Sequence, residues 1–221
     1  MYLTRVTLNP RRRATSRLLA SPRRVHGAVG QLFPPDGRPD RALWRTDETP
    51  SGTYLYVLSD VRADPTGVVE EYGWPHADQP WLSRDYGPVL SAVVDGRRFG
   101  FRTCVNPVTS VRPGVDGDAG GARGRWKRVA HVTAAQQLAW FTDRSDGWGF
   151  TVDGDGLGAR LVERRVRTFD REGRTVTLST AVVEGVLAVT TASLLQDALV
   201  RGIGPAKAYG CGLLTLAPAG P

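Results

Sequence analysis

A cluster of glycines near the C-terminus has the composition of a phosphate-binding loop. The segment GIGPAKAYGCG contains Gly202, Gly204, Gly210 and Gly212, with Lys207 between them. Glycine permits backbone conformations and a close approach to ligands that other residues resist. Successive free N–H groups in such a loop can bind phosphate, and a lysine adds positive charge. The spacing matches neither a Walker A loop nor a dinucleotide fingerprint, and a tight connection between a helix and an edge strand is the structural alternative.

Three histidines are the candidates for proton transfer, because imidazole titrates near neutral pH. His26 lies beside the apolar stripe of a predicted helix, and a lone histidine in such a place is more often structural than catalytic. His76 follows Trp74 and Pro75 in an irregular segment, and His131 follows a basic segment. We interpret the last two as non-catalytic, His76 as structural.

The charge balance favours a polyanionic partner. Lysine and arginine number 29 against 22 acidic residues, a formal net charge of +7, and only Lys127 and Lys207 are lysines. An arginine bias can also reflect a GC-rich genome, but excess positive charge is rewarded when phosphates release their counterions. Lys127 and Arg128 close a segment, Arg-Trp-Lys-Arg, that suits contact with a nucleic-acid backbone, and a solvated charged turn is the alternative.

Several protein classes are excluded by composition. Two cysteines cannot form a disulfide framework or a four-thiolate zinc site, and the histidines lack metal-ligand spacing. We therefore expect no metal. No apolar run approaches the roughly 18 residues of a membrane helix, and the N-terminus lacks the apolar core of a secretory signal. A cytoplasmic protein without membrane contact is predicted.

The elements that must position these residues follow from hydrophobic periodicity and turn signals. In the first half we predict strand 1–9, a loop that contains residues 11–13, a helix beginning near residues 21–22, strands 42–46 and 53–59, helix 68–72, and strand 89–94. In the second half we predict strands within 97–111, a mobile segment 113–125, helix 133–141, the hairpin 159–169 and 174–189, helix 191–201, and strand 209–217.

Both halves thus have the order β-α-β-β-α-β of a ferredoxin-like fold. The predicted fold class is α+β, with two tandem ferredoxin-like (RRM-like) domains. Residues 1–96 form the first domain, which carries the helix with His26, and residues 97–221 form the second, which carries the glycine-rich loop. This sheet recurs in RNA-binding modules, an argument from fold analogy alone.

The sequence as a whole resembles a known family. Glycine-rich loops of this pattern mark the repeat-RNA-processing proteins of CRISPR systems, and the fuller string GIGPAKAYGCGLLTLAP is similar to the C-terminus of the CasE family of type I-E systems. The opening MYLTRVTLNP, the helix with His26, and the segments FRTCVNPVTSV and GRWKRV resemble that family in the same order. The resemblance covers essentially the whole chain.

The resemblance implies a metal-independent endoribonuclease without a cofactor. It would cut precursor CRISPR RNA below the repeat hairpin by attack of the 2′-OH, leaving a 2′,3′-cyclic phosphate and a 5′-OH. The expected partners are the CRISPR repeat RNA hairpin, the mature guide RNA, which stays bound, and the other Cascade subunits.

The resemblance also assigns site residues. The family's helix histidine matches His26, which would act as general acid or base. Arg23 stands where a tyrosine is often found, so a tyrosine role does not carry over. Arg23 lies on the same helix face as His26, and our hypothesis is that it stabilises the phosphate instead. The family's basic segment matches Lys127 and Arg128, and the loop glycines with Lys207 would contact RNA.

Two other functions remain open at this point. A non-catalytic scaffold subunit would bind the RNA hairpin with normal affinity and release no product, and the departure at Arg23 keeps this alternative in view. A nucleotide-binding enzyme would use the glycine loop for a mononucleotide phosphate, but the catalytic acid pair or metal motif that it needs is not evident.

Overall fold

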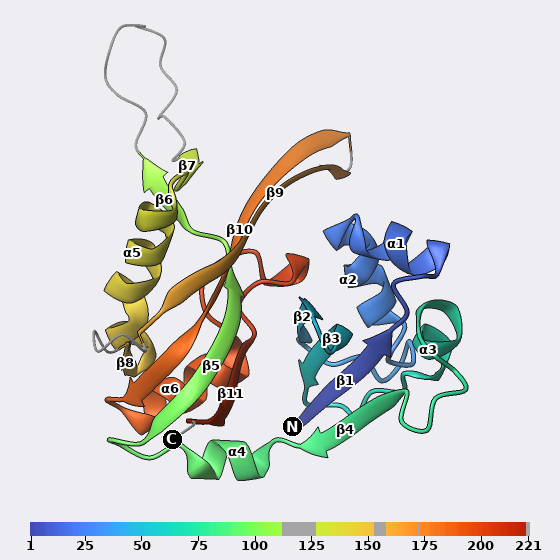
Figure 1. The fold of residues 1–221 in the computed structure, drawn as a ribbon, viewed down its shortest axis with the longest axis horizontal. Coiled ribbons are helices and arrows are strands. Elements are labelled where there is room, and N and C mark those ends of the chain that lie inside the picture. The colour runs from blue at the N-terminus through green and yellow to red at the C-terminus, as the bar shows by residue number, and fades with distance from the viewer. Residues whose placement is uncertain (112–126, 153–157, 172, 220–221) are drawn as a thin grey trace, which may run out of the picture.

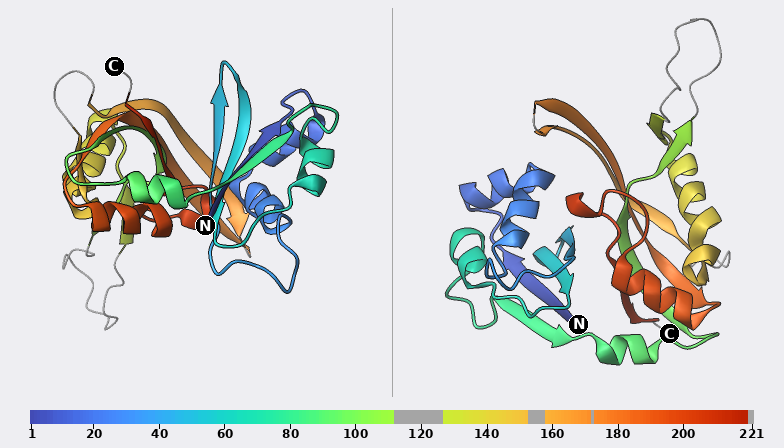
Figure 2. Two further views of the ribbon diagram at one scale, coloured as in Figure 1. Left: turned by 90° about the horizontal axis from the view of Figure 1, so that it is seen from below. Right: turned by 180° about the vertical axis from the view of Figure 1, so that it is seen from behind.

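A computed structural model describes residues 1–111, 127–152, 158–171 and 173–219. Its two main antiparallel sheets lie in the two halves of the molecule, with α4 (Gly87–Ala92) running between them (Figure 1). The views in Figure 2 show helices α1, α2 and α3 gathered around the first sheet, and α5 and α6 against the second.

The first sheet has the strand order β2-β3-β1-β4, and all its pairs are antiparallel. Its strands are β1 (Tyr2–Leu8), β2 (Leu43–Thr49), β3 (Gly52–Ser59) and β4 (Trp81–Asp85). Its helices are α1 (Arg13–Leu19), α2 (Pro22–Gly30) and α3 (Thr66–Tyr72). Alternate residues of β1 are buried, as one covered face of a sheet requires.

Helix α2 forms where the sequence predicts it. Pro22 occupies the first turn, where its missing N–H costs nothing. Val25 and Val29 are buried one turn apart, and Leu32 and Phe33 continue the apolar contact beyond the helix. The predicted stripe is therefore confirmed, although Ser21 at the N-cap makes no side-chain capping bond.

The second sheet has the order β11-β5-β10-β8, with β9 paired to β10. Its strands are β5 (Arg98–Val105), β8 (Phe150–Val152), β9 (Arg160–Arg171), β10 (Arg174–Val189) and β11 (Leu214–Pro218). Its helices are α5 (Ala134–Ser145) and α6 (Ala192–Arg201), with short 3-10 turns η1 (Asp146–Trp148) and η2 (Lys207–Tyr209). A small separate pair joins β6 (Val108–Val111) to β7 (Lys127–Ala130).

Three predictions about elements are wrong. The predicted strand 89–94 lies in helix α4 and the turn after it, and β4 takes the sixth place in the β-α-β-β-α-β order. Helix α1 begins at Arg13, where we predicted a loop. The last strand begins at Leu214 rather than near residue 209, because η2 and two left-handed glycines precede it. The segment 113–125, predicted to be mobile, lies outside the described residues.

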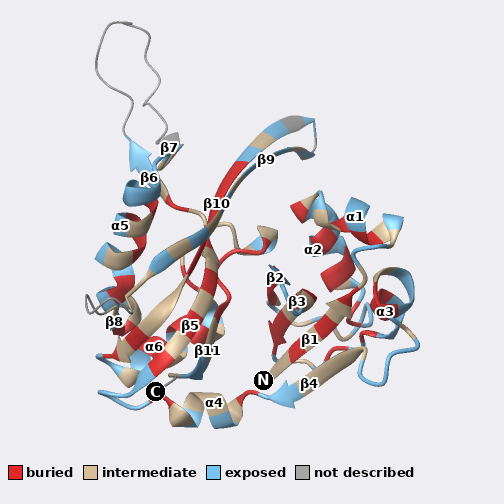
Figure 3. Cartoon of the chain, in the orientation of Figure 1, coloured by how far each residue is buried: buried red, intermediate tan, exposed pale blue. Residues whose placement is uncertain are grey.

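Both halves are ferredoxin-like, as predicted. In each, the first strand lies between the third and fourth, which gives the orders β2-β3-β1-β4 and, counting β9 as the second strand, β9-β10-β5-β11. Figure 3 shows buried residues along the strands and the inner faces of the helices. One buried cluster lies under α1, α2 and α3; the other fills the second half and includes Leu43 and Leu58 of the first sheet. The division at residues 96 and 97 stays a prediction.

None of the helices in the described ranges is long and apolar enough to cross a membrane.

Candidate functional site

A cavity of about 330 Å³ lies where α2 meets the glycine-rich loop. One wall is formed by α2 and the residues after it, and the opposite wall by the loop. The lining residues are His26, Val29, Gly30, Phe33, Arg38, Pro39, Asp40, Arg41, Ala42, Lys207 and Ala208. The cavity thus joins His26 and Lys207, which are 181 positions apart in the sequence and belong to different predicted domains.

His26 reaches the cavity because of its position in α2. Val25 and Val29 anchor the helix in the core, and His26, one residue after Val25, lies on the exposed edge of the buried stripe. Its imidazole is therefore accessible to a ligand from solvent.

The cavity carries an excess of positive charge. Arg38, Arg41 and Lys207 face one acidic residue, Asp40. Lys207 Nζ donates to the carbonyl oxygen of Gly204 at 2.6 Å, which uses one of its three N–H groups. Partial burial, with a smaller contribution from the nearby Arg41, lowers the pKa of Lys207. A phosphate would relieve both effects, because it supplies the missing negative charge.

The glycines are required by packing. Gly210 has a φ of 83°, and a Cβ built on it would lie 2.5 Å from Trp44 Cζ3. Gly202 has a φ of 73°, and its Cβ would lie 2.8 Å from Leu43 Cδ2. Any side chain at either position would have to displace the side chain of Trp44 or Leu43, so these glycines allow the loop to lie directly against β2.

Most of the glycine N–H groups already have partners inside the protein. Gly212 N–H donates to the carbonyl oxygen of Cys104 at 2.7 Å, and Gly202 N–H to that of Ala198 at 2.9 Å. Gly210 N–H donates to the carbonyl oxygen of Lys207 at 3.3 Å. In this conformation the loop presents Lys207 to the cavity, while these three amides hold its shape. RNA binding by Gly202, Gly204, Gly210 and Gly212 stays a prediction.

Arg23 does not line the cavity. It is exposed on α2, and its Nη1 donates to the carbonyl oxygen of Asp170 at 3.5 Å. Asp170 lies near the tip of the β9–β10 hairpin, which arches toward α1 and α2 (Figure 1). Arg23 therefore links the helix of His26 to the hairpin, and its proposed contact with phosphate stays a prediction.

Lys127 and Arg128 lie on β7, opposite Val111 and Ser110 of β6. In Figures 1 and 2 this strand pair lies beside the N-terminal end of α5, away from α2. The structure therefore does not bring Lys127 and Arg128 to the His26 cavity, and Arg125 and Trp126 lie outside the described residues.

The arginines of β9 alternate between two faces, as a strand requires. Arg165 Nη1 pairs with Glu48 Oε1 of β2 at 3.0 Å, so this face looks toward the first sheet. Arg164 Nε instead donates to Gln137 of α5 at 2.9 Å. Half-buried Arg167 lines a small pocket that also includes Arg165.

Arg38 and Arg41 were missed by the sequence analysis. They belong to the segment 37–41, in which glycine, proline and charged residues follow the first helix pattern. A charged loop directly after a candidate catalytic helix is the signal that could have indicated them.

His131 and His76 lie elsewhere. His131 N–H donates to the carbonyl oxygen of Pro107 at 3.0 Å, and its own carbonyl accepts from Gln137. His76 is exposed in the segment after α3. Within the described part of the chain, no three or more His, Cys, Asp and Glu side chains gather where they could hold a metal ion.

Comparison with known proteins gives one consistent relationship. Residues 1–218 match the model of the family described as CRISPR associated protein. The CRISPR-associated endoribonuclease Cse3 of Thermus thermophilus is 30% identical over 99% of this chain and 100% of that protein. The Cascade subunit CasE of Escherichia coli is 29% identical over the same shares.

A solved structure of Thermus thermophilus Cse3, bound to an RNA that represents a pre-cleavage complex, superposes with a TM-score of 0.75. In this pre-cleavage form it is 28% identical and covers 98% of each chain. Two structures of the CRISPR endoribonuclease Cse3 bound to a 19-nucleotide RNA superpose with a TM-score of 0.73. With the family match over almost its whole length, the chain belongs to the CasE family of CRISPR-associated proteins.

Proposed function

We propose that this protein is a metal-independent endoribonuclease that cleaves precursor CRISPR RNA below the repeat hairpin and keeps the mature guide RNA. The observation that carries the proposal is the joint placement of His26 and Lys207 on one cation-rich cavity, in a chain of the CasE family. Two relatives, one an endoribonuclease by name and the other a Cascade subunit, support the same activity and the same assembly. The reaction would take place in the cytoplasm, and the other Cascade subunits would be partners.

The proposed chemistry uses the nucleophile that RNA itself supplies. The 2′ oxygen forms a bond to phosphorus while the bond from phosphorus to the 5′ oxygen breaks. The proton of the 2′-OH leaves to a base, and the 5′ oxygen receives a proton. The products are a 2′,3′-cyclic phosphate and a 5′-OH, and the step needs no water, oxidant or cofactor.

The cavity residues fit these requirements. His26 exchanges one of the two protons, as general acid or general base, because its imidazole is accessible and an imidazole can both accept and donate a proton. Lys207 and Arg41 stabilise the additional negative charge on the phosphoryl oxygens. Val29 and Phe33 form an apolar side of the cavity, which strengthens these electrostatic interactions by excluding water.

The test is cleavage of an end-labelled cognate repeat hairpin in excess EDTA, with the product ends resolved. We expect one cut, a 2′,3′-cyclic phosphate, and a guide RNA that remains bound to the protein. Tight binding of the hairpin without any cut, with or without divalent cations, would contradict the proposal and favour the scaffold function.

A further inference from the structure

Strand β2 packs directly against the glycine-rich loop. Leu43 faces Gly202 and Trp44 faces Gly210, each close enough to exclude a Cβ on the glycine. The next residue, Arg45, donates from Nη1 to the carbonyl oxygen of Leu213 at 2.9 Å. Leu43 and Trp44 therefore contact the loop on either side of Lys207, and Arg45 binds the residue that directly follows the loop.

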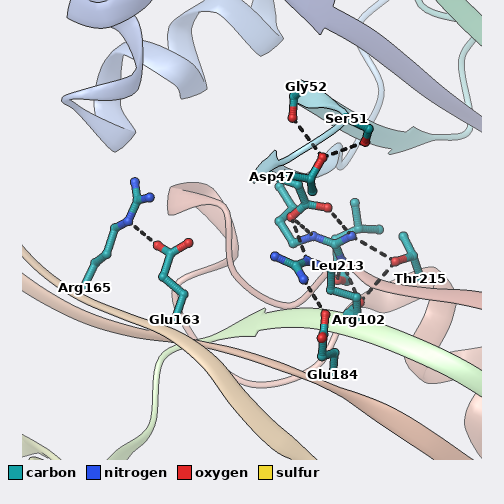
Figure 4. Close-up of polar contacts among 11 residues, drawn as sticks. Asp47, Ser51, Gly52, Arg102, Glu163, Arg165, Glu184, Leu213 and Thr215 are labelled. Atoms are coloured by element: carbon teal, nitrogen blue, oxygen red, sulfur yellow. Dashed lines mark hydrogen bonds and ion pairs between the residues drawn. The ribbon is translucent and has the colours of Figure 1, made fainter. Parts of the chain in front are cut away.

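The guanidinium of Arg45 is fully engaged. It is 2% exposed, and Nε and Nη2 donate to the two carboxylate oxygens of Asp47 at 2.8 and 2.9 Å. Figure 4 labels Asp47, Leu213 and Thr215, three of the residues that Arg45 binds. Nη1 also donates to the carbonyl oxygen of Arg102 at 2.7 Å, and Nη2 to Thr215 Oγ1 at 3.0 Å. These contacts provide an acceptor for each of the five N–H groups of an arginine.

The hydrogen bonds of Arg45 connect the first sheet to the second. Asp47 shares β2 with Arg45, whereas Arg102, Leu213 and Thr215 lie on β5, directly before β11, and on β11. Because a guanidinium is a planar fork with fixed donor directions, its bonds to Asp47 orient it on β2, and its three acceptors in the second half fix how the two sheets meet at this point.

Further ion pairs extend from Asp47 into the second sheet. Arg102 Nε lies 3.4 Å from Asp47 Oδ1, and Arg102 also pairs with Glu184, which pairs with Arg160 Nη2 at 2.7 Å. Positive and negative groups alternate along this series of ion pairs, which runs from buried Arg45 to Arg160, whose side chain is 73% exposed. The outer member provides a control, because it belongs to the same network but does not contact the loop.

We propose that Arg45 is a positioning residue that holds the glycine-rich loop so that Lys207 faces His26 across the cavity. The inference rests on the proposed function. Arg45 is buried and does not line the cavity, so it acts through the loop rather than on the RNA. Displacement of Lys207 by 1 Å is enough to slow a reaction that depends on aligned groups by about 100-fold.

The experiment compares two quantities for each variant. One is the single-turnover cleavage rate at saturating protein, and the other is the affinity for a hairpin with a 2′-deoxy nucleotide at the cut site. Arg45→Met is expected to lower the rate by about 100-fold while the affinity stays near that of the wild type. Arg45→Lys should not restore the rate, because an ammonium cannot reproduce the planar fork. Arg160→Met should cleave like the wild type.

A second variant separates positioning from folding. Arg45→Met leaves Asp47 buried without its main partner, so the double variant R45M/D47L replaces the pair by apolar side chains, an exchange that proteins often tolerate. A double variant that melts like the wild type and cleaves slowly supports the proposal. A folded single or double variant with the wild-type rate, or equal losses of rate and affinity, overturns it. Absence of cleavage by the wild type would instead overturn the proposed function, and this inference with it.

Discussion

At the scale of single residues, the site combines one accessible imidazole with a lysine whose charge is partly shielded from water. The side chain of Val25 is buried in the core, so the next residue of α2, His26, lies on the exposed side of the helix. Lys207 is held by its bond to the Gly204 carbonyl. The sequence identified both residues. It could not show that they share a cavity, because that depends on contacts between distant segments.

Lys207→Met should preserve or raise stability while slowing cleavage. Burial lowers the pKa of Lys207 from its usual 10.5, so the charged lysine costs free energy in the folded state at pH 7, below both the folded and the unfolded pKa. This cost falls as pH rises through the folded pKa toward 10.5, and the advantage of the methionine should shrink over the same range. Urea unfolding at pH 7 and under alkaline conditions measures this. A less stable variant at pH 7, with the gap growing at high pH, would contradict it.

Arg23→Ala tests whether this arginine replaces the tyrosine often found in the family. If Arg23 leaves the Asp170 carbonyl and binds the scissile phosphate, its loss should slow cleavage by roughly 10²-fold, as for other single donors to a reacting oxyanion. The neighbouring exposed residue Arg24 provides the control, as Arg24→Ala. An unchanged single-turnover rate for Arg23→Ala would contradict a role in phosphate binding. The bond to the β9–β10 hairpin would then be the one contact assigned to Arg23.

At the scale of elements, local patterns predicted most of the helices and strands. The sequence predicts a helix from residue 133, and in the structure a capping box formed by Thr133 and Gln136 begins α5 there. Periodicity failed at 89–94, because a short apolar run fits a strand or a buried helix equally well, and Gly87-Pro88 begins a helix there. Helix α1 has no side-chain cap; long-range bonds such as Thr15 Oγ1 to the Tyr72 carbonyl stabilise it, and a sequence does not show these.

The same limit applies to the glycine loop. Its composition indicated a phosphate-binding nest, but three of its four glycine amides have partners within the protein. The contact of Gly210 with Trp44 depends on the packing of two predicted domains against each other. Composition therefore located the loop that borders the cavity, but it could not show that contacts with β2 also require glycine at positions 202 and 210.

Gly210→Ala should destabilise the protein and move the loop. The new Cβ would lie 2.5 Å from Trp44, at a φ of 83°. Overpacking and left-handed strain together should cost about 3 kcal/mol and lower the Tm by roughly 6–12 °C. Gly96→Ala is the matched control, because Gly96 has a φ of 79° with no atom near its Cβ position. Thermal unfolding of both variants isolates the contact with Trp44; equal losses would contradict it.

At the scale of the whole molecule, two ferredoxin-like halves place basic groups at several separate locations. The His26 cavity, the β9 face with Arg165 and the β7 strand lie on different elements. A formal charge of +7 spread in this way suits a long polyanion better than a small ligand. An RNA hairpin can contact several of these places at once and remain bound after the cut.

Affinity for the hairpin should therefore depend steeply on salt. The logarithm of the association constant should fall linearly with the logarithm of salt concentration, by about 0.7 to 0.9 for each phosphate neutralised. Lys207→Met should reduce the slope by about 1, because it removes one phosphate contact. Filter binding with the 2′-deoxy hairpin across a salt series measures both slopes, and a flat dependence would exclude backbone contacts as the main source of affinity.

The central claim is that His26 transfers a proton in RNA cleavage without a metal. The most direct measurement is the single-turnover cleavage rate of the cognate hairpin in excess EDTA, for the wild type, His26→Ala, and His76→Ala as a control at another exposed histidine. We predict that His26→Ala binds the 2′-deoxy hairpin normally but cleaves about 10² to 10⁴-fold more slowly, while His76→Ala keeps the wild-type rate. Cleavage by His26→Ala at the wild-type rate would contradict the account.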